Sequence, residues 1–209
     1  MASVAGASPL SRAVGGGLEI SGMVLCGGLA LGVGAPSVAD LSAALLLMIM
    51  GRAIRLPGPD LLPLAWLGLT LAFVMVAIRW GSPSLESIQG AHGVLGLTTG
   101  TEFTVAATLF AVLGALIGLA SHLSLAPPGV EEWIIRAAGA LAGGLAVGAV
   151  FLGQAGKEGL LIPLGLVVGA AALGLGLLLS KASGRVPSAA AVASPALAAV
   201  GLGLVVFGP

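Results

Sequence analysis

The sequence has few charged residues and no tyrosine. Of its 209 residues, 8% are charged and 58% are hydrophobic, whereas an average soluble domain carries roughly 25% charged residues. The eight Lys and Arg balance the eight Asp and Glu, so no basic field is available to hold a nucleic acid. This composition argues against a soluble enzyme, a nucleic-acid-binding protein and a disordered tail. It favours a polytopic membrane protein.

Cysteine and histidine are almost absent as well. Cys26 is the single cysteine, which excludes an intrachain disulfide and a cysteine-based metal site. His92 and His122 are the two histidines, and the topology predicted below places them on opposite sides of the membrane. We therefore predict no metal site, no catalytic set and no cofactor. A chlorophyll-type pigment held by His92 alone, or a bound lipid, stays an open alternative.

Seven apolar stretches are candidates for transmembrane helices, which need about 20 residues each. They are separated by turns rich in Pro and Gly. The second is the shortest, because only eleven residues lie between Asp40 and Arg52. We predict an all-α integral membrane protein with a bundle of seven helices, or six if the second does not span. The stretches are 18–34, 37–51, 61–78, 101–122, 132–153, 160–180 and 188–208.

The basic residues predict the orientation of the bundle. With the N-terminus in the cytoplasm, Arg79 and Lys157 lie outside, and the other six basic residues lie on the inner side, as the positive-inside rule requires. The C-terminus is then outside. Within one membrane domain (1–209), residues 1–17 form a cytoplasmic segment and 81–100 a long outer loop. The inner basic residues are Arg12, Arg52, Arg55, Arg136, Lys181 and Arg185.

A weak internal similarity links the two ends of the chain. The sequence GGLALG at 27–32 resembles GGLAVG at 143–148. Transporters are often built from such repeats, so 18–80 and 132–208 are candidate repeat units. Composition alone generates similar matches, and that alternative stays open.

No ionisable residue is expected at the middle of a span, because all sixteen charged residues lie near predicted span ends or in connections. Buried charges in membranes mark ion paths and proton relays. Their expected absence argues against a proton pump, a sodium symporter and a voltage sensor. Asp40 and Glu102 each follow a hydroxyl residue by three positions, Ser37 and Thr99, which predicts capping boxes. The alternative is that both acids line an outward-facing vestibule.

Polar candidates for contacts with a solute or a partner occur in two places. Glu86, Gln89 and His92 lie in the 81–100 connection, whose apolar residues predict a surface helix or a segment that dips between helices. Thr104 and Thr108, one turn apart in the fourth span, could form an interhelical hydrogen bond.

Glycines spaced four apart are the positive feature of the spans. Such pairs let helix backbones approach closely in lipid. They predict a tightly packed bundle or docking against partner helices. The predicted packing glycines are Gly28, Gly32, Gly114, Gly118, Gly139, Gly143, Gly144, Gly148, Gly165 and Gly169.

Three function classes follow. The favoured one is a structural or accessory subunit that packs against other membrane subunits or further copies of itself. The second is a small transporter or channel for a weakly polar or uncharged solute, with Thr70, Thr104 and Thr108 along its path. The third is an intramembrane lipid-modifying enzyme that uses Glu86, His92 or the acids at 131–132. The high content of Ala, Gly, Leu and Val is typical of a GC-rich bacterium, so we expect a location in a bacterial inner (plasma) membrane.

Overall fold

The computed structural model describes residues 8–55, 62–91, 102–124, 130–151, 160–181 and 186–208. This part of the chain contains no β-sheet, only an isolated antiparallel bridge between Ser37 and Ser84. The all-helical prediction is confirmed. The helices are α1 (Pro9–Ala30), α2 (Val38–Arg55), α3 (Leu62–Trp80), α4 (Leu85–Ala91), α5 (Glu102–Ser124), α6 (Val130–Phe151), α7 (Leu161–Lys181) and α8 (Val186–Phe207).

Five of these helices, α1, α5, α6, α7 and α8, are long and apolar enough to cross a membrane. The apolar part of α3 is shorter, at 66–80, and the 18 residues of α2 include three charged ones. Large apolar side chains such as Val24, Ile134 and Leu178 are exposed on the outside of the bundle. Extensive exposed apolar surface is typical of contact with lipid. The fold is therefore that of a helical, multi-pass membrane protein.

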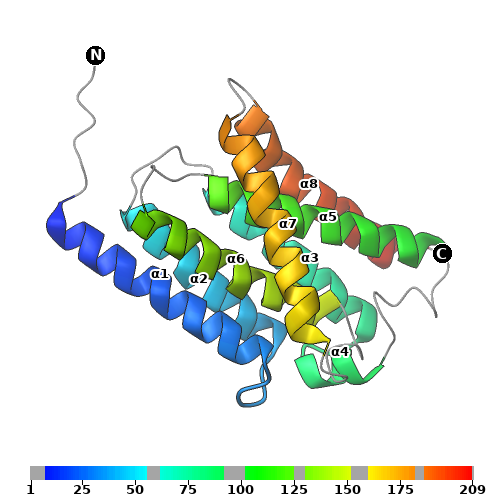
Figure 1. Ribbon diagram of the computed structural model, residues 1–209. Helices are drawn as coiled ribbons and strands as arrows, with labels where there is room; N and C mark the ends of the chain where they lie inside the picture. The colour runs from blue at the N-terminus through cyan, green and yellow to red at the C-terminus, as the bar shows by residue number, and fades with distance from the viewer. Residues whose placement is uncertain are drawn as a thin grey trace.

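The helices pack in two adjoining groups (Figure 1). In the first, α1 and α2 lie side by side and α6 packs along α1. In the second, α5 lies against α8, and α3 packs on both of them. The helix α7 joins the groups because it contacts both α6 and α5. In the core, the rings of Phe73 on α3 and Phe151 on α6 lie 6.3 Å apart.

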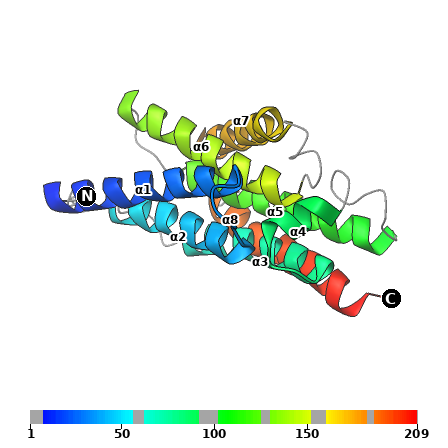
Figure 2. The same ribbon diagram turned by 90° about the horizontal axis from the view of Figure 1, so that it is seen from below.

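The first helix differs from its predicted position. It begins at Pro9 and not at residue 18, so residues 9–17 of the expected cytoplasmic segment 1–17 are helical. Ser8 caps the helix by accepting a hydrogen bond from the backbone N–H of Ser11 at 3.0 Å, and proline is favoured at the first helical position. The first turns of α1 extend beyond the end of α2 (Figure 2). As a result, Glu19 lies in the middle of α1.

The segment between α1 and α2 confirms one predicted capping box. The Ser37 hydroxyl and backbone N–H donate to Asp40 at 2.7 and 2.8 Å, and the Asp40 N–H donates back to the Ser37 hydroxyl at 3.2 Å. Asp40 is exposed. The second predicted capping box involves Thr99, which lies outside the described residues.

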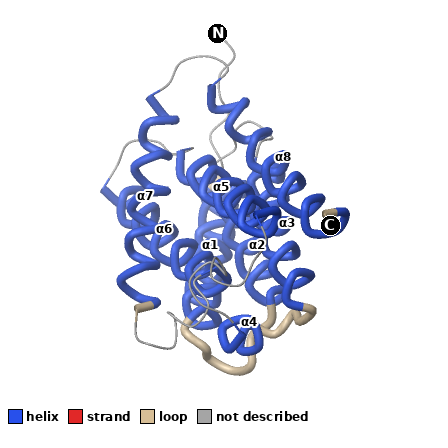
Figure 3. The backbone as a smooth tube through the Cα atoms, turned by 90° about the vertical axis from the view of Figure 1, so that its right-hand side faces the viewer, coloured by secondary structure: helices blue, strands red, loops and turns tan. Residues whose placement is uncertain are grey.

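Part of the long connection between α3 and α5 is helical. Helix α4 lies across one end of the bundle (Figure 3), with Leu85 and Ile88 each only 1% exposed. The backbone N–H of Leu85 donates to the carbonyl of Pro36, which ties α4 to the turn before α2. This short helix therefore packs into the end of the bundle. The rest of the predicted loop 81–100, from residue 92, lies outside the described residues.

Candidate functional site: a buried ionic cluster

Four charged side chains from three helices meet inside the bundle. They are Glu19 of α1, Arg52 and Arg55 of α2, and Glu132 of α6, and we name them the ionic cluster. Their side chains are 0%, 1%, 11% and 8% exposed, respectively. Because the first turns of α1 extend past α2, the middle of α1 is level with the last turn of α2 and the first turn of α6. The cluster therefore lies at one end of the bundle.

Each carboxylate of the ionic cluster contacts both arginines. Arg52 binds Glu19 through Nη1 at 3.0 Å and approaches Glu132 through Nη2 at 3.3 Å. Arg55 contacts Glu19 through Nη2 at 2.7 Å and Nε at 2.8 Å, and Glu132 through Nη1 at 2.6 Å. Charge-assisted hydrogen bonds of this kind are short and directional. The four groups thus hold α1, α2 and α6 in one defined arrangement.

Glycines bring the backbones of α1 and α2 close enough for these contacts. A Cβ atom added at Gly15 would lie 2.6 Å from both the Gly51 carbonyl oxygen and the Arg55 nitrogen, and one added at Gly22 would meet the backbone of Met48. Gly15, Glu19 and Gly22 are spaced by four and three residues, so they share one face of α1. Because the α1 backbone touches the α2 backbone here, the Glu19 side chain is long enough to reach the two arginines of α2.

Glu19 contradicts the expectation that no ionisable residue lies at the middle of a span, because it lies in the middle of α1. Arg52 and Arg55 are expected in a connection, but they lie in the last turn of α2, and all three side chains are buried or nearly so. Glu132 and Arg136, near the start of α6, are buried as well. The desolvation cost of these buried charges is offset here, because opposite charges meet at hydrogen-bonding distance.

Two further side chains lie at the edge of the ionic cluster. Arg136 follows Glu132 by one helical turn, and its guanidinium lies 5.6 Å from the ring of Trp133. His122 of α5 is 1% exposed, and Arg52 and Arg55 act on it electrostatically. Among the described residues, neither ring nitrogen of His122 has a hydrogen-bond partner. The cluster thus adjoins a buried imidazole with unused hydrogen-bonding capacity.

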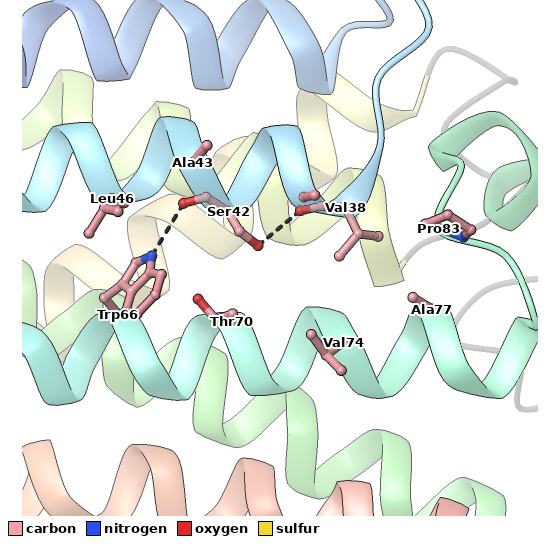
Figure 4. Close-up of a pocket in the computed structure, with 10 residues that line it drawn as sticks. Val38, Ser42, Ala43, Leu46, Trp66, Thr70, Val74, Ala77 and Pro83 are labelled. Carbon is pink, nitrogen blue, oxygen red and sulfur yellow. Dashed lines mark hydrogen bonds between the residues drawn. The ribbon is translucent and has the colours of Figure 1, made fainter.

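A pocket of about 410 Å³ lies between α2 and α3, near the opposite end of α2 from the ionic cluster (Figure 4). Its wall is mostly apolar, and its polar side chains are Ser42, Trp66 and Thr70. The described residues contain no group of three His, Cys, Asp or Glu that could hold a metal ion. Helix α2 therefore carries two features: a pocket along its first half and the two cluster arginines in its last turn.

Of the predicted polar contacts, Glu86 and Thr108 are described, and neither belongs to the ionic cluster. Glu86 is exposed on α4, and Thr108 is buried on α5, where it accepts a hydrogen bond from Arg79 of α3. Arg79 also lies over the ring of Trp80, 4.7 Å from its centre. Gln89 and Thr104 belong to α4 and α5, but their side chains, and the whole of His92, lie outside the described residues. Whether these residues meet a solute or a partner stays a prediction.

Most of the predicted packing glycines lie where helices touch. A Cβ at Gly169 of α7 would lie 2.5 Å from the Ala140 carbonyl oxygen of α6, and one at Gly165 would lie 2.7 Å from Leu145. A Cβ at Gly114 of α5 would lie 2.8 Å from the Ser194 carbonyl oxygen of α8, where the Ser194 hydroxyl donates to the Gly114 carbonyl. The buried glycines of the predicted set are Gly114, Gly118, Gly139, Gly143, Gly144, Gly148, Gly165 and Gly169.

Gly32 makes no close contact with another helix among the described residues, and Gly28 is only half-buried. Gly32 lies in the turn after α1 with a φ of +85°, a conformation that favours glycine for backbone reasons. A Cβ at Gly28 would meet only the side chain of Val33, at 3.9 Å. Conversely, Gly15, Gly22 and Gly51 make close contacts that the four-residue spacing did not reveal.

Comparison with protein-family models, with curated proteins and with solved structures finds no match to this chain.

Proposed function

We propose that this protein is a small multi-pass membrane transporter for an uncharged or weakly polar solute, in which the ionic cluster locks one end of the bundle. The observation that carries the proposal is that α2 bears both the buried cluster and the pocket. A change at the lock therefore acts directly on a helix that forms the solute site. Buried ionisable groups within membrane helices are functional candidates by default.

The energetics of buried ion pairs support a lock better than a purely structural role. Desolvation offsets much of the attraction between buried charges, so an apolar core of the same volume is often as stable. An ionic contact has a property that an apolar contact lacks, because water stabilises its separated groups once they are exposed. Such a contact can close one end of a bundle and also open, as alternating access requires.

The proposal keeps seven spans with the N-terminus inside. By the alternating direction of the helices, Arg79 lies at the opposite end from the other described basic residues. The positive-inside rule makes the end with more basic residues cytoplasmic, and the ionic cluster is then the inner lock. The basic residues at this end are Arg12, Arg52, Arg55, Arg136 and Lys181.

An accessory subunit is the second candidate. Many of the glycines expected to dock partner helices are occupied by contacts within the chain, which favours a self-contained bundle. However, Gly17, Gly27, Gly174 and Gly203 have no atom near the position of an added Cβ, and these open positions favour docking of a partner helix. The enzymatic alternative is weaker, because Arg52 and Arg55 occupy both carboxylate oxygens of Glu132.

Solute flux tests the proposal directly. The purified protein is reconstituted in vesicles, and uptake of uncharged solutes such as glycerol, urea and propanediol is followed by stopped-flow light scattering. We expect at least one solute to enter faster than into protein-free vesicles, and Glu132→Gln to raise that rate by weakening the lock. The matched control is Glu131→Gln, because Glu131 is the exposed neighbour of Glu132. Equal rates with and without protein, together with co-purifying subunits in native mass spectrometry, would favour the accessory function.

Labelling of Cys26 reports opening of the lock without any engineered cysteine. Cys26 is 0% exposed, and its thiol donates to the Ala142 carbonyl of α6 at 3.5 Å. Separation of α1 from α6 exposes it to N-ethylmaleimide. We expect Glu132→Gln to speed labelling about tenfold, which corresponds to a shift of about 1.4 kcal/mol in the opening equilibrium. Glu131→Gln should label at the wild-type rate. Equal labelling of all three folded proteins would contradict a moving α1–α6 contact.

A further inference from the structure

The pocket between α2 and α3 is held open by hydrogen bonds at its two ends. At one end, the indole Nε1 of Trp66 donates to the Ser42 carbonyl oxygen at 3.2 Å. At the other end, the Val38 N–H donates to the Pro83 carbonyl oxygen at 2.8 Å. Figure 4 shows Trp66 and Pro83 on opposite sides of the pocket. These two ties fix the spacing of the helices, so the pocket cannot close by a simple approach of α2 to α3.

Thr70 provides a polar group inside this pocket. Its Oγ1 is buried and has no hydrogen-bond partner among the described residues. The hydroxyl of Ser42, in contrast, donates to the Val38 carbonyl of its own helix at 2.9 Å. A helical Thr can satisfy its hydroxyl in the same way, by donating one turn back. Thr70 does not, and its hydroxyl points across the pocket toward α2 (Figure 4).

A buried hydroxyl without a hydrogen-bond partner destabilises the folded protein, so its direction into a pocket indicates a missing partner. We propose that the pocket binds an uncharged, largely apolar molecule that places one hydroxyl or carbonyl oxygen against Thr70. The other lining residues are apolar apart from Ser42 and Trp66, and none is charged, so an ionic ligand would remain uncompensated. This assignment rests on the proposed function, because it names the class of solute that the transporter carries.

The same chemistry occurs in a small solute that enters from water and in the ester region of a membrane lipid. A volume of about 410 Å³ is within the range of small-molecule pockets. The experiment therefore includes one arm for each source.

Trp66 is a built-in reporter for occupancy of the pocket. The other tryptophans are Trp80 and Trp133, and Trp80→Phe with Trp133→Phe leaves Trp66 as the only fluorophore. In nanodiscs, quenching by 6-bromohexanol is compared with quenching by 1-bromohexane, each corrected for partition into protein-free discs. We expect saturable quenching by both and about fivefold tighter binding of the alcohol, the value of one net hydrogen bond. Discs of brominated lipid form the second arm, in which relief of quenching by unlabelled hexanol identifies a lipid ester in the same site.

Thr70→Val removes the hydroxyl and keeps the shape of the side chain. It should weaken binding of the alcohol about fivefold and leave binding of the alkane unchanged. Ala77→Leu fills the pocket and should abolish saturable quenching by both probes, with thermal unfolding as the check that each variant is folded. Quenching that never saturates, equal affinity for alcohol and alkane, or an unchanged Thr70→Val variant would each overturn the assignment. If binding depends on Thr70 but no solute flux is seen, the transport function is wrong and the pocket assignment stands. If flux is seen but binding does not depend on Thr70, the pocket assignment is wrong and the transport function stands.

Discussion

Glu132→Gln is expected to destabilise the folded protein by about 3 kcal/mol, because it leaves buried Arg52 and Arg55 with one carboxylate where they had two. In a chain of this size, such a change lowers the melting temperature by about 6–12 °C. The measurement is thermal unfolding in a mild detergent, followed by circular dichroism or tryptophan fluorescence. Glu131→Gln removes a charge from the same turn of α6 but from an exposed position, and it should change the melting temperature little.

A second comparison separates stability from function. Replacing all four cluster residues together (Glu19→Leu, Arg52→Met, Arg55→Leu and Glu132→Met) removes every buried charge of the cluster at once. Such replacements are often neutral or stabilising, so we expect this variant to keep the wild-type melting temperature, which Glu132→Gln does not, but to leave Cys26 unlabelled and the solute flux lost. A variant that folds and also transports normally would show that the cluster is structural.

Gly51→Ala is expected to cost about 3 kcal/mol, the upper part of the range for overpacked contacts. The added methyl group would lie against the backbone nitrogen of Glu19 and 2.6 Å from the Gly15 carbonyl oxygen. Backbone atoms cannot turn aside as a side chain can, so α1 and α2 have to separate. The separation also lengthens the Glu19 contacts with Arg52 and Arg55, and the loss is measured by thermal unfolding.

Gly17→Ala is the matched control for this change. Gly17 is also within the α1–α2 hairpin, but no atom lies within 4 Å of its added Cβ. The same substitution should therefore stabilise the protein by up to about 1 kcal/mol, because alanine favours the helix more than glycine does. A similar loss at both positions would contradict the close α1–α2 contact and point to an outside partner on the open face of α1.

The positions of six of the long helices could be predicted because they depend on local properties of the sequence. Apolar runs and the Pro- and Gly-rich turns between them locate α2, α3, α5, α6, α7 and α8 within a few residues. The capping box at Ser37 and Asp40 depends on a three-residue spacing and was equally accessible. The number of spans and their orientation rest on the positive-inside rule and stay predictions.

The first helix and the ionic cluster could not be predicted in this way, because both depend on contacts between distant residues. Glu19 is acidic and lies two residues after a run of three glycines, so the sequence around it is typical of a helix boundary. Its burial makes sense only when Arg52 and Arg55 are adjacent, 33 and 36 residues further along the chain. A signal existed in the spacing: Arg52 and Arg55 share one face of α2, while Glu19 lies between two small residues on one face of α1.

The carboxylate in the middle of α1 also constrains biogenesis. A charged residue at the centre of a lone helix raises the free energy of membrane insertion by about 3 kcal/mol, and Glu19 has no partner until Arg52 and Arg55 have been synthesised. We therefore expect the first helix to insert less efficiently alone than together with the second, whose two arginines pair with Glu19. The cluster becomes neutral only when α6 adds Glu132.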